Sequence, residues 1–258
     1  MTAGANADLQ TRWPYPRILA HRGGGALAPE NTMAGMREAH ARRMRGVEFD
    51  VMLAADGIPI LMHDTELGRT VPGVGDLGAF DSEELGRMDA GAWFSPHFQG
   101  EPVPRLEDAV QWLRRHDVWM NIEIKPMPGH DVDTAEVVGQ MVQDLFADVS
   151  DPTRRPLFSS FSVKALDAAR ETAPGIPRGL LVEGVPPDWE SRLRSLGCVS
   201  LHCRHDRLDA GLARHIKTAG YGLMCYTVND PARARELFSW GVDALCTDRY
   251  DVIGADFR

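Results

Sequence analysis

Short runs of apolar residues alternate with stretches of helical periodicity along most of the chain. Residues 18–20 form one such run, residues 32–43 have the spacing of an amphipathic helix, and residues 47–51 form the next run. This alternation is typical of βα units, whose strands lie parallel in one sheet. Further strand-like runs follow at 119–124, 157–161, 179–182, 198–202, 223–228 and 244–247. Because about eight such runs are present, the sequence predicts an α/β fold of the TIM-type (β/α)8 barrel class.

One apolar run interrupts this rhythm. Residues 58–62 follow the run at 47–51 after only a short turn-like segment. A parallel crossover needs about a dozen residues, so we expect the run to return antiparallel as the second strand of a hairpin. If Asp56-Gly57 forms a two-residue turn, the register places His63 opposite Asp50 on the neighbouring strand.

The segment from residue 65 to residue 105 is rich in Gly, Pro and aromatic residues and has no clean period. It is longer than a βα connection requires, and we interpret it as an insertion that lids the C-terminal face of the barrel. Trp93 and Phe94 within it fit a stacking contact with a substrate and a structural anchor equally well. No linker or repeat divides the chain, so residues 1–258 are expected to form one domain.

Composition and charge exclude several partners. The formal net charge of -9 and the pI near 5.5 disfavour nucleic acid, because no basic cluster overrides the overall negative charge. Residues 1–16 contain no long apolar run, so neither a signal peptide nor a membrane partner is expected, and the location expected by default is cytoplasmic. The cysteines are scattered in apolar runs and are expected to be reduced, buried thiols. They are Cys198, Cys203, Cys225 and Cys246.

Polar residues follow or end several of the predicted strands, where barrel enzymes carry their catalytic groups. They are His21, Arg22, Glu48, Asp50, His63, Glu123 and Lys125. Since side chains alternate in direction along a strand, Glu48 and Asp50 share one face. Glu123 and Lys125 share one face of their strand for the same reason. We therefore expect these polar side chains to meet at the mouth of the barrel.

The residue types in this group indicate a metal site that accepts phosphate. Glu48, Asp50 and Glu123 form an oxygen-rich set suited to one hard divalent cation, Mg²⁺, Ca²⁺ or Mn²⁺, rather than zinc. Arg22 and Lys125 beside such a cation suit one phosphate group, because the guanidinium forks onto phosphate oxygens and the ammonium adds a compact charge.

Two histidines complete the predicted chemistry. Cleavage of a phosphodiester requires one group that takes a proton from the nucleophile and another that gives a proton to the leaving alkoxide. His21 and His63 can exchange protons near neutral pH, and are therefore the candidates for these two steps.

Several motifs carry these residues. They are HRGGGALAPENT at 21–32, EFDV at 48–51, DGIPILMHD at 56–64, NIEIKP at 121–126, SSF at 159–161, YTVND at 226–230 and CTD at 246–248. Together they resemble the glycerophosphodiester phosphodiesterase family, and residues 13–25 most resemble its bacterial cytosolic branch, which is associated with glycerol 3-phosphate uptake. One departure is Tyr226, where many members of the family carry Trp.

The resemblance implies hydrolysis of small glycerophosphodiesters to sn-glycerol 3-phosphate and an alcohol at one divalent cation. By the same resemblance, His21 and His63 correspond to the acid/base pair, and Arg22 and Lys125 to the phosphate contacts. Glu48, Asp50 and Glu123 correspond to the metal ligands. The head group, the native metal, a cyclic phosphate intermediate and the oligomeric state stay open.

Two other functions are alternatives to this interpretation. One is a lipid-cleaving relative with similar barrel ends, which the lack of a membrane-docking amphipathic stretch disfavours. The other is a non-catalytic sensor, which does not require two proton-transferring histidines beside a metal site.

Residues near the motifs have mainly structural interpretations. Glu30 is expected to support Arg22, and Asn31 or Thr32 to cap the following helix. His202 is a candidate for the pocket wall, and His205 for a polar strand end.

Overall fold

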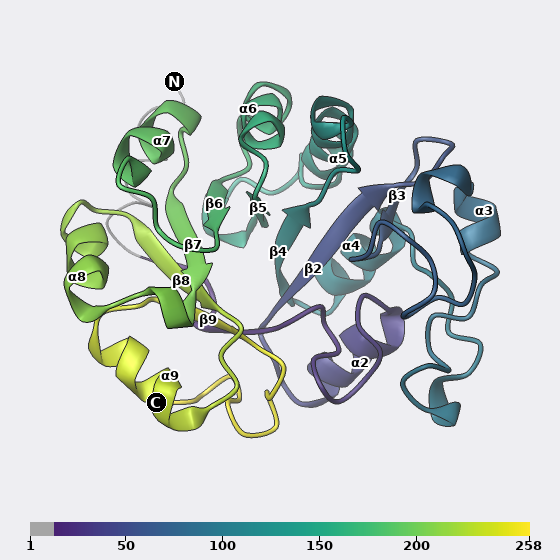
Figure 1. Ribbon diagram of the computed structural model, residues 1–258, viewed down its shortest axis with the longest axis horizontal. Helices are drawn as coiled ribbons and strands as arrows, with labels where there is room; N and C mark the ends of the chain where they lie inside the picture. The colour runs from purple at the N-terminus through teal and green to yellow at the C-terminus, as the bar shows by residue number, and fades with distance from the viewer. Residues whose placement is uncertain (1–12) are drawn as a thin grey trace.

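The computed structural model describes residues 13–258, so the expectation for residues 1–16 falls mostly outside the described residues. Within them, eight parallel strands close into a ring, as β1 pairs with both β9 and β2 (Figure 1). The ring strands are β1 (Ile18–Ala20), β2 (Gly46–Leu53), β4 (Trp119–Ile124), β5 (Leu157–Ser160), β6 (Arg178–Val182), β7 (Ser200–Arg204), β8 (Gly222–Tyr226) and β9 (Ala244–Thr247). The predicted TIM-type barrel is confirmed.

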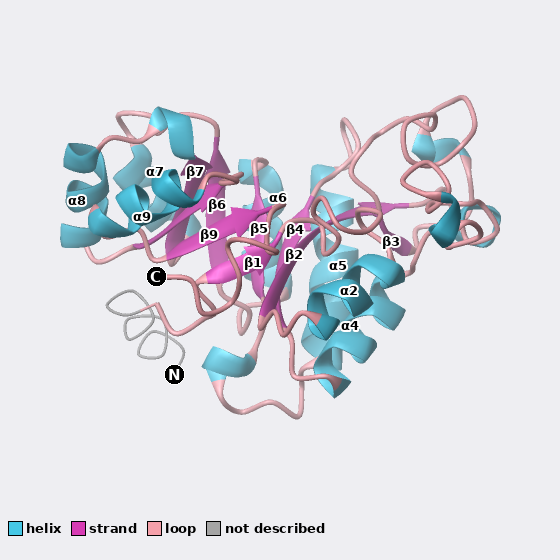
Figure 2. Cartoon of the chain, turned by 90° about the horizontal axis from the view of Figure 1, so that it is seen from below, coloured by secondary structure: helices cyan, strands magenta, loops and turns pink. Residues whose placement is uncertain are grey.

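Helices connect successive ring strands and surround the sheet (Figure 2). They are α2 (Met33–Ala41), α4 (Leu106–Arg115), α5 (Asp131–Leu145), α6 (Val163–Thr172), α7 (Trp189–Leu196), α8 (Ala210–Thr218) and α9 (Pro231–Ser239). The predicted helix over residues 32–43 is α2. Thr32 is its N-cap, since the Thr32 hydroxyl accepts a hydrogen bond from the Gly35 amide at 3.1 Å. Of the described helices, none is long and apolar enough to cross a membrane.

The main core of the barrel follows from the alternation of side chains along the strands. Outward-facing residues such as Val47 and Phe49 pack against the helices and are fully buried. At the N-terminal end of the barrel, an aromatic cluster joins Tyr15 and Trp119, whose rings stack at 4.4 Å, with Trp13, whose ring contacts Tyr15 edge-on. The polar strand ends lie at the opposite end of the ring.

Strand β3 (Pro59–Leu61) lies outside the ring and runs antiparallel to β2, as predicted. The predicted register is wrong by one residue. Leu61 pairs with Val51, and the Met62 amide donates to the Asp50 carbonyl at 3.2 Å. Asp50 is therefore opposite Met62 and not opposite His63.

The cause of this shift is the length of the turn. The Ala54 amide donates to the Ile58 carbonyl at 3.0 Å, and the Gly57 amide returns to the Ala54 carbonyl at 2.9 Å. The loop thus contains three residues, and Gly57 adopts a φ of +76°, in the left-handed region that favours glycine. The extra loop residue moves the whole strand by one position.

The segment between β3 and α4 lies beside β2 and β3, to one side of the ring (Figure 1). It contains the 3₁₀ helices η1 (Leu77–Ala79) and η2 (Pro96–Phe98) and the short helix α3 (Ser82–Leu85). Its apolar residues, among them Leu77 and Leu85, form a second cluster with Met52 of β2 and Ile60 of β3. The segment is therefore anchored to the hairpin, and its action as a lid stays a prediction.

Candidate active site

The carboxylates of Glu48 and Asp50, on β2, and of Glu123, near the C-terminal end of β4, come together. Asp50 and Glu123 are register partners on the neighbouring strands, and Glu48 lies on the same face of β2 as Asp50. One oxygen from each residue lies within 4.8 Å of the others. All three side chains are almost completely buried.

Burial and mutual repulsion shift the pKa values of this cluster. The pKa of Glu123 is raised well above its ordinary value by burial, and further by Asp50 and Glu48. The pKa of Glu48 is also raised by burial and by Asp50. Burial alone would raise the pKa of Asp50 too, but nearby Lys125 and Arg22 outweigh it and lower this pKa. Three close, buried carboxylates with oxygen ligands fit one hard divalent cation.

The two predicted cationic residues flank this cluster. Arg22 Nε lies 3.5 Å from Asp50 Oδ2, and Lys125 Nζ lies 3.6 Å from Asp50 Oδ1. The loop after β1 holds Arg22 in place, because the Arg22 amide donates to Glu48 Oε2 at 2.9 Å. Gly24 permits the tight turn, since an added Cβ would lie 2.3 Å from the Ala28 carbonyl oxygen. An anion at the cluster would therefore meet two positive side chains.

Each of the two predicted histidines is paired with an aspartate through Nδ1. His21 Nδ1 lies 2.7 Å from Asp248 Oδ1, and His63 Nδ1 lies 2.7 Å from Asp64 Oδ1. An ionised carboxylate only accepts hydrogen bonds, so Nδ1 of each ring carries the proton and Nε2 is left free. The Nε2 atom of His21 lies 4.0 Å from Glu48 Oε2.

The pKa values of the two imidazoles are shifted in opposite directions. Burial opposes the charged form of His21, but the Asp248 hydrogen bond and the Glu48 charge outweigh it, and the pKa is raised. For His63, burial outweighs the attraction of Asp50 and Asp64, and the pKa is lowered. Relative to an ordinary imidazole, His21 thus holds its proton more strongly and His63 less strongly.

Sequence reasoning missed the residues that orient His21. Asp248 follows β9, and its second carboxylate oxygen accepts a hydrogen bond from Asn229 Nδ2 at 2.8 Å. Asn229 Oδ1 in turn accepts from the Asp248 amide at 2.8 Å. Both residues belong to motifs at the ends of β8 and β9. Their position at strand ends is the only sequence feature that indicates a role in the site, and the motifs alone do not say which role.

The loop before α2 supports the site in two ways. Glu30 accepts a hydrogen bond from Arg22 Nη1 at 2.8 Å, as predicted. Asn31 does not cap the helix; its Nδ2 donates to Asp50 Oδ2 at 2.9 Å, and its Oδ1 accepts from the Asp50 amide at 3.1 Å. Asn31 therefore fixes the orientation of a carboxylate of the cluster.

Three other residues that the sequence suggested as pocket or substrate contacts make contacts within the fold. His202 is fully buried, hydrogen-bonds Ser200 Oγ at 2.9 Å and does not line the pocket, which corrects the sequence-based hypothesis. Burial lowers the pKa of His202 to about 3.

Trp93 donates to the Ala90 carbonyl at 2.9 Å and packs edge-on against Phe94, so its contacts lie within the inserted segment.

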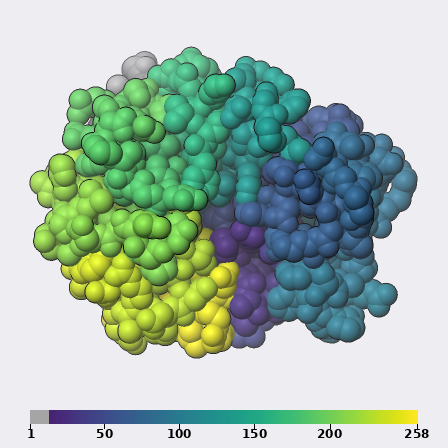
Figure 3. Space-filling model, in the orientation of Figure 1, coloured from purple at the N-terminus to yellow at the C-terminus, as the bar shows by residue number. Residues whose placement is uncertain are grey.

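Two hollows open beside the histidines. One, of about 460 Å³, is lined by His63, Lys125 and Arg69, and the other, of about 370 Å³, by His21 and Asp248. In Figure 3, the early, purple part of the chain is exposed between the blue inserted segment and the yellow C-terminal part.

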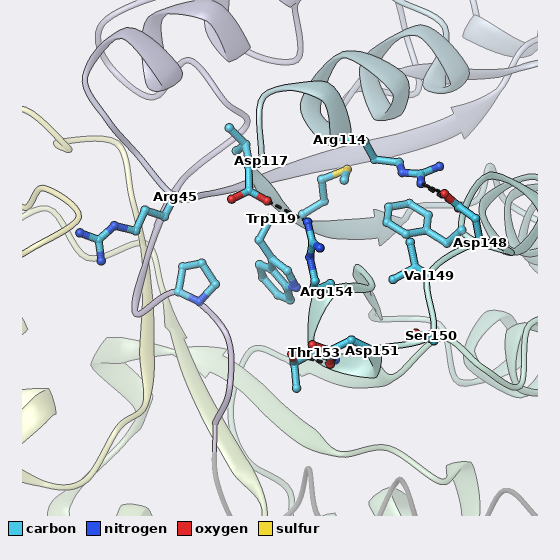
Figure 4. A pocket seen from close by; sticks show the side chains of 14 residues that line it. Arg45, Arg114, Asp117, Trp119, Asp148, Val149, Ser150, Asp151, Thr153 and Arg154 are labelled. Atoms are coloured by element: carbon cyan, nitrogen blue, oxygen red, sulfur yellow. Dashed lines mark hydrogen bonds and ion pairs between the residues drawn. The ribbon is translucent and has the colours of Figure 1, made fainter.

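A third cavity, of about 570 Å³, lies near the N-terminal ends of β2 and β4 (Figure 4). Its charged residues are paired with one another or with neighbours, as in the ion pairs Arg114–Asp148 and Arg154–Asp117. No histidine lines it among the described residues. The chemistry is therefore assigned to the opposite end of the barrel.

Comparison with known proteins agrees with this geometry. The model described as "Glycerophosphoryl diester phosphodiesterase family" matches residues 21–252. An Oleispira antarctica phosphodiesterase, solved in complex with the product sn-glycerol-3-phosphate, superposes with a TM-score of 0.87 at 34% identity over 93% of this chain and 96% of the other.

Curated relatives point the same way. A putative glycerophosphodiester phosphodiesterase of Bacillus subtilis is 30% identical over 93% of this chain and 97% of its own length. A glycerophosphodiester phosphodiesterase of Caldanaerobacter subterraneus is 30% identical over 90% of this chain and 93% of its own length.

Proposed function

Because the chain belongs to the glycerophosphoryl diester phosphodiesterase family, we propose that it hydrolyses glycerophosphodiesters to sn-glycerol 3-phosphate and an alcohol, with one divalent cation. The observation that carries this proposal is the convergence of Glu48, Asp50 and Glu123 within 4.8 Å. Without a cation, three buried carboxylates repel one another, so their convergence at one point supports a metal site. Mg²⁺, Ca²⁺ and Mn²⁺ all prefer such oxygen ligands.

The substrate phosphate is proposed to lie between the carboxylate cluster and the two cationic side chains. A bound divalent cation supplies charge stabilisation to a phosphoryl oxygen. The Arg22 guanidinium presents a planar fork to phosphate oxygens, and Lys125 adds a point charge. The 3.5 and 3.6 Å separations of these groups from Asp50 support this position.

His21 and His63 are proposed to carry the two proton transfers. During hydrolysis a phosphorus–oxygen bond to the nucleophile forms, and the bond to the leaving alcohol breaks. One imidazole takes the proton of the nucleophile, and the other gives a proton to the leaving oxygen. Asp64 and Asp248 each bind Nδ1 and leave Nε2 for this role. The lowered pKa of His63 suits the base, and the raised pKa of His21 suits the acid.

The test is a reconstitution assay. The chelated protein receives Mg²⁺, Ca²⁺ or Mn²⁺, and sn-glycerol 3-phosphate release is measured from glycerophosphocholine, glycerophosphoethanolamine and glycerophosphoglycerol. We expect turnover with at least one cation and none in chelator. Full activity in chelator contradicts the metal site. Binding without turnover in calorimetry indicates a sensor, and turnover of phospholipid vesicles in place of glycerophosphodiesters indicates a lipid-cleaving enzyme.

A further inference from the structure

Arg69, in the inserted segment, binds two carboxylates at once. Its Nε and Nη2 atoms lie 2.6 and 3.1 Å from the two oxygens of Asp64. Its Nη1 and Nη2 atoms lie 2.8 and 2.6 Å from the two oxygens of Glu30. One guanidinium thus makes two paired contacts, a geometry that the five N–H groups of arginine permit and an ammonium does not.

Each of these carboxylates also holds a residue of the proposed active site. Asp64 binds His63 Nδ1 at 2.7 Å through Oδ1, the oxygen that also contacts Arg69 Nη2. Glu30 binds Arg22 Nη1 at 2.8 Å through Oε1. Two continuous chains of hydrogen bonds therefore start at Arg69. One ends at an imidazole, and the other at a guanidinium beside the carboxylate cluster.

The backbone around Arg69 is fixed. The Leu67 amide donates to the Gly75 carbonyl at 3.0 Å, and the Gly68 amide donates to the Val71 carbonyl at 2.8 Å. Leu67 and Val71, on either side of Arg69, are buried in the apolar cluster of the inserted segment. Arg69 is therefore presented by a hydrogen-bonded loop with two apolar anchors.

The charges of Asp64 and Glu30 are also stabilised by Arg69. Arg69 and His63 lower the pKa of Asp64 to about 2 despite the opposing effect of burial. The Arg69 and Arg22 contacts lower the pKa of Glu30 in the same way. Without Arg69, Asp64 and Glu30 would lose their shared counter-charge, and each would be held on the side of the site only, by His63 or by Arg22.

We infer that Arg69 is a positioning residue, which orients His63 through Asp64 and Arg22 through Glu30. This inference rests on the proposed function. A solvent-exposed ion pair usually contributes little to stability, and the Arg69 side chain is 46% exposed. Its effect is accordingly expected in catalysis rather than in folding.

The test compares Arg69→Ala with a matched control, Arg170→Ala. Arg170 also binds two carboxylates, Asp167 at 2.9 Å and Glu171 at 2.8 Å, and is 40% exposed, but it lies on α6 away from the site. We expect Arg69→Ala to lower kcat about tenfold or more and to raise KM several-fold. Arg170→Ala should match the wild type, and the melting temperatures of both variants should be similar. Arg69→Lys should recover only part of the loss.

Double-mutant cycles separate the two chains of contacts. In an Asp64→Asn background the effect of Arg69→Ala on kcat should shrink to about threefold or less, because the route to His63 is already broken. In a Glu30→Gln background the effect on KM should shrink in the same way. If Arg69→Ala fails to fold, Arg69→Lys replaces it in both cycles.

The inference is overturned if kcat and KM of Arg69→Ala stay within twofold of those of Arg170→Ala, or if Arg69→Lys has wild-type kinetics. It is also overturned if the effects of Arg69→Ala on kcat and KM are the same in the Asp64→Asn and Glu30→Gln backgrounds as in the wild type. A wild-type protein that releases no sn-glycerol 3-phosphate with any cation refutes the proposed function, and this inference with it. Wild-type turnover with an unaffected Arg69→Ala refutes the inference alone.

Discussion

Replacing Glu123 by Gln should have opposite effects on stability with and without a divalent cation. The substitution removes a charge from the buried cluster but keeps the shape of the side chain. In chelator, where the carboxylates repel one another, Glu123→Gln should stabilise the protein. With saturating Mg²⁺, Ca²⁺ or Mn²⁺, the loss of a ligand should reduce the stabilisation that the cation gives.

The distance in the cluster sets the size of the first effect. The ligand oxygens lie no more than 4.8 Å apart, and for two unit charges at that separation an effective dielectric constant of about 20 gives a repulsion of about 3.5 kcal/mol. The wild-type protein avoids part of this repulsion by keeping a proton on the cluster, so a gain of about 1–3 kcal/mol is expected for the variant. In a chain of this length, that corresponds to a rise in Tm of about 3–10 °C.

The pH dependence gives an independent check of the sign. The pKa of Glu123 is raised in the folded state relative to its ordinary value of 4.5. Between these two values the folded state keeps a proton that the unfolded state releases. The stability of the metal-free wild type should therefore fall as the pH rises from about 4.5 towards the folded-state pKa. Glu123→Gln should reduce this loss, and Glu48, whose pKa is also raised, should leave a remainder.

The measurement is thermal unfolding of both proteins in chelator and in a series of cation concentrations, at several pH values. A lower Tm of Glu123→Gln in chelator would contradict the repulsion argument. A wild-type Tm that does not respond to any of the three cations would contradict the metal site itself. Neither result depends on catalytic activity.

Three further predictions concern the histidines and Arg22. His21→Ala and His63→Ala should each lower kcat about a hundredfold or more while the circular dichroism spectrum stays unchanged; an unchanged kcat removes that residue from the mechanism. Arg22→Lys should lower kcat/KM at least tenfold, because a point charge does not replace the planar fork; near-normal kinetics contradicts this. Burial lowers the pKa of His202 to about 3 in the folded state, against about 6.5 when unfolded. As the pH falls through 6.5, the unfolded state therefore takes up a proton that the folded state does not. The free energy of unfolding of the wild type should fall by about 2 kcal/mol between pH 7 and pH 5. His202→Gln should lose less over this interval in denaturant titrations, and an equal loss refutes the assignment.

The barrel and the carboxylate cluster could be predicted because both depend on local patterns. The alternation of apolar runs with helical stretches defines βα units, and β-strand geometry places Glu48 and Asp50 on one face without knowledge of their neighbours. Closure of the ring then brings Glu123 beside Asp50, since parallel strands end at the same edge. No side-chain contact was needed for this inference.

The register of β3 could not be predicted with the same certainty. Two-residue and three-residue turns both accommodate Asp56-Gly57, and they differ by one position in the strand that follows. The hydrogen bond from the Ala54 amide to the Ile58 carbonyl decides for the longer turn. His63 nevertheless reaches the site, because it lies beyond β3 and after Met62, the last residue that hydrogen-bonds β2, so the alternation along the strand does not set the direction of its side chain.

The contacts that orient the histidines and Arg22 were missed for another reason. Asp248 is separated from His21 by 227 positions, and Arg69 from Glu30 by 39. A charged residue after a strand or in a loop has many candidate partners in the sequence, and no spacing rule chooses among them. Asp64, adjacent to His63, was visible as part of a motif, but the side chain that it binds depends on a rotamer.

The charges of the site connect these observations. Glu48, Asp50 and Glu123, when ionised, exceed Arg22 and Lys125 by one negative charge. A phosphodiester is a monoanion, so it would be repelled from a fully ionised cluster and weakly held by a protonated one. One divalent cation reverses the sign and leaves one net positive charge at the point where the diester binds. The same cation favours the ionised forms of Glu48 and Glu123, whose pKa values are raised by burial and by repulsion between the carboxylates, so metal binding should release protons. Stability, cation affinity and substrate binding are thus consequences of one charge balance, and Glu123→Gln perturbs all three together.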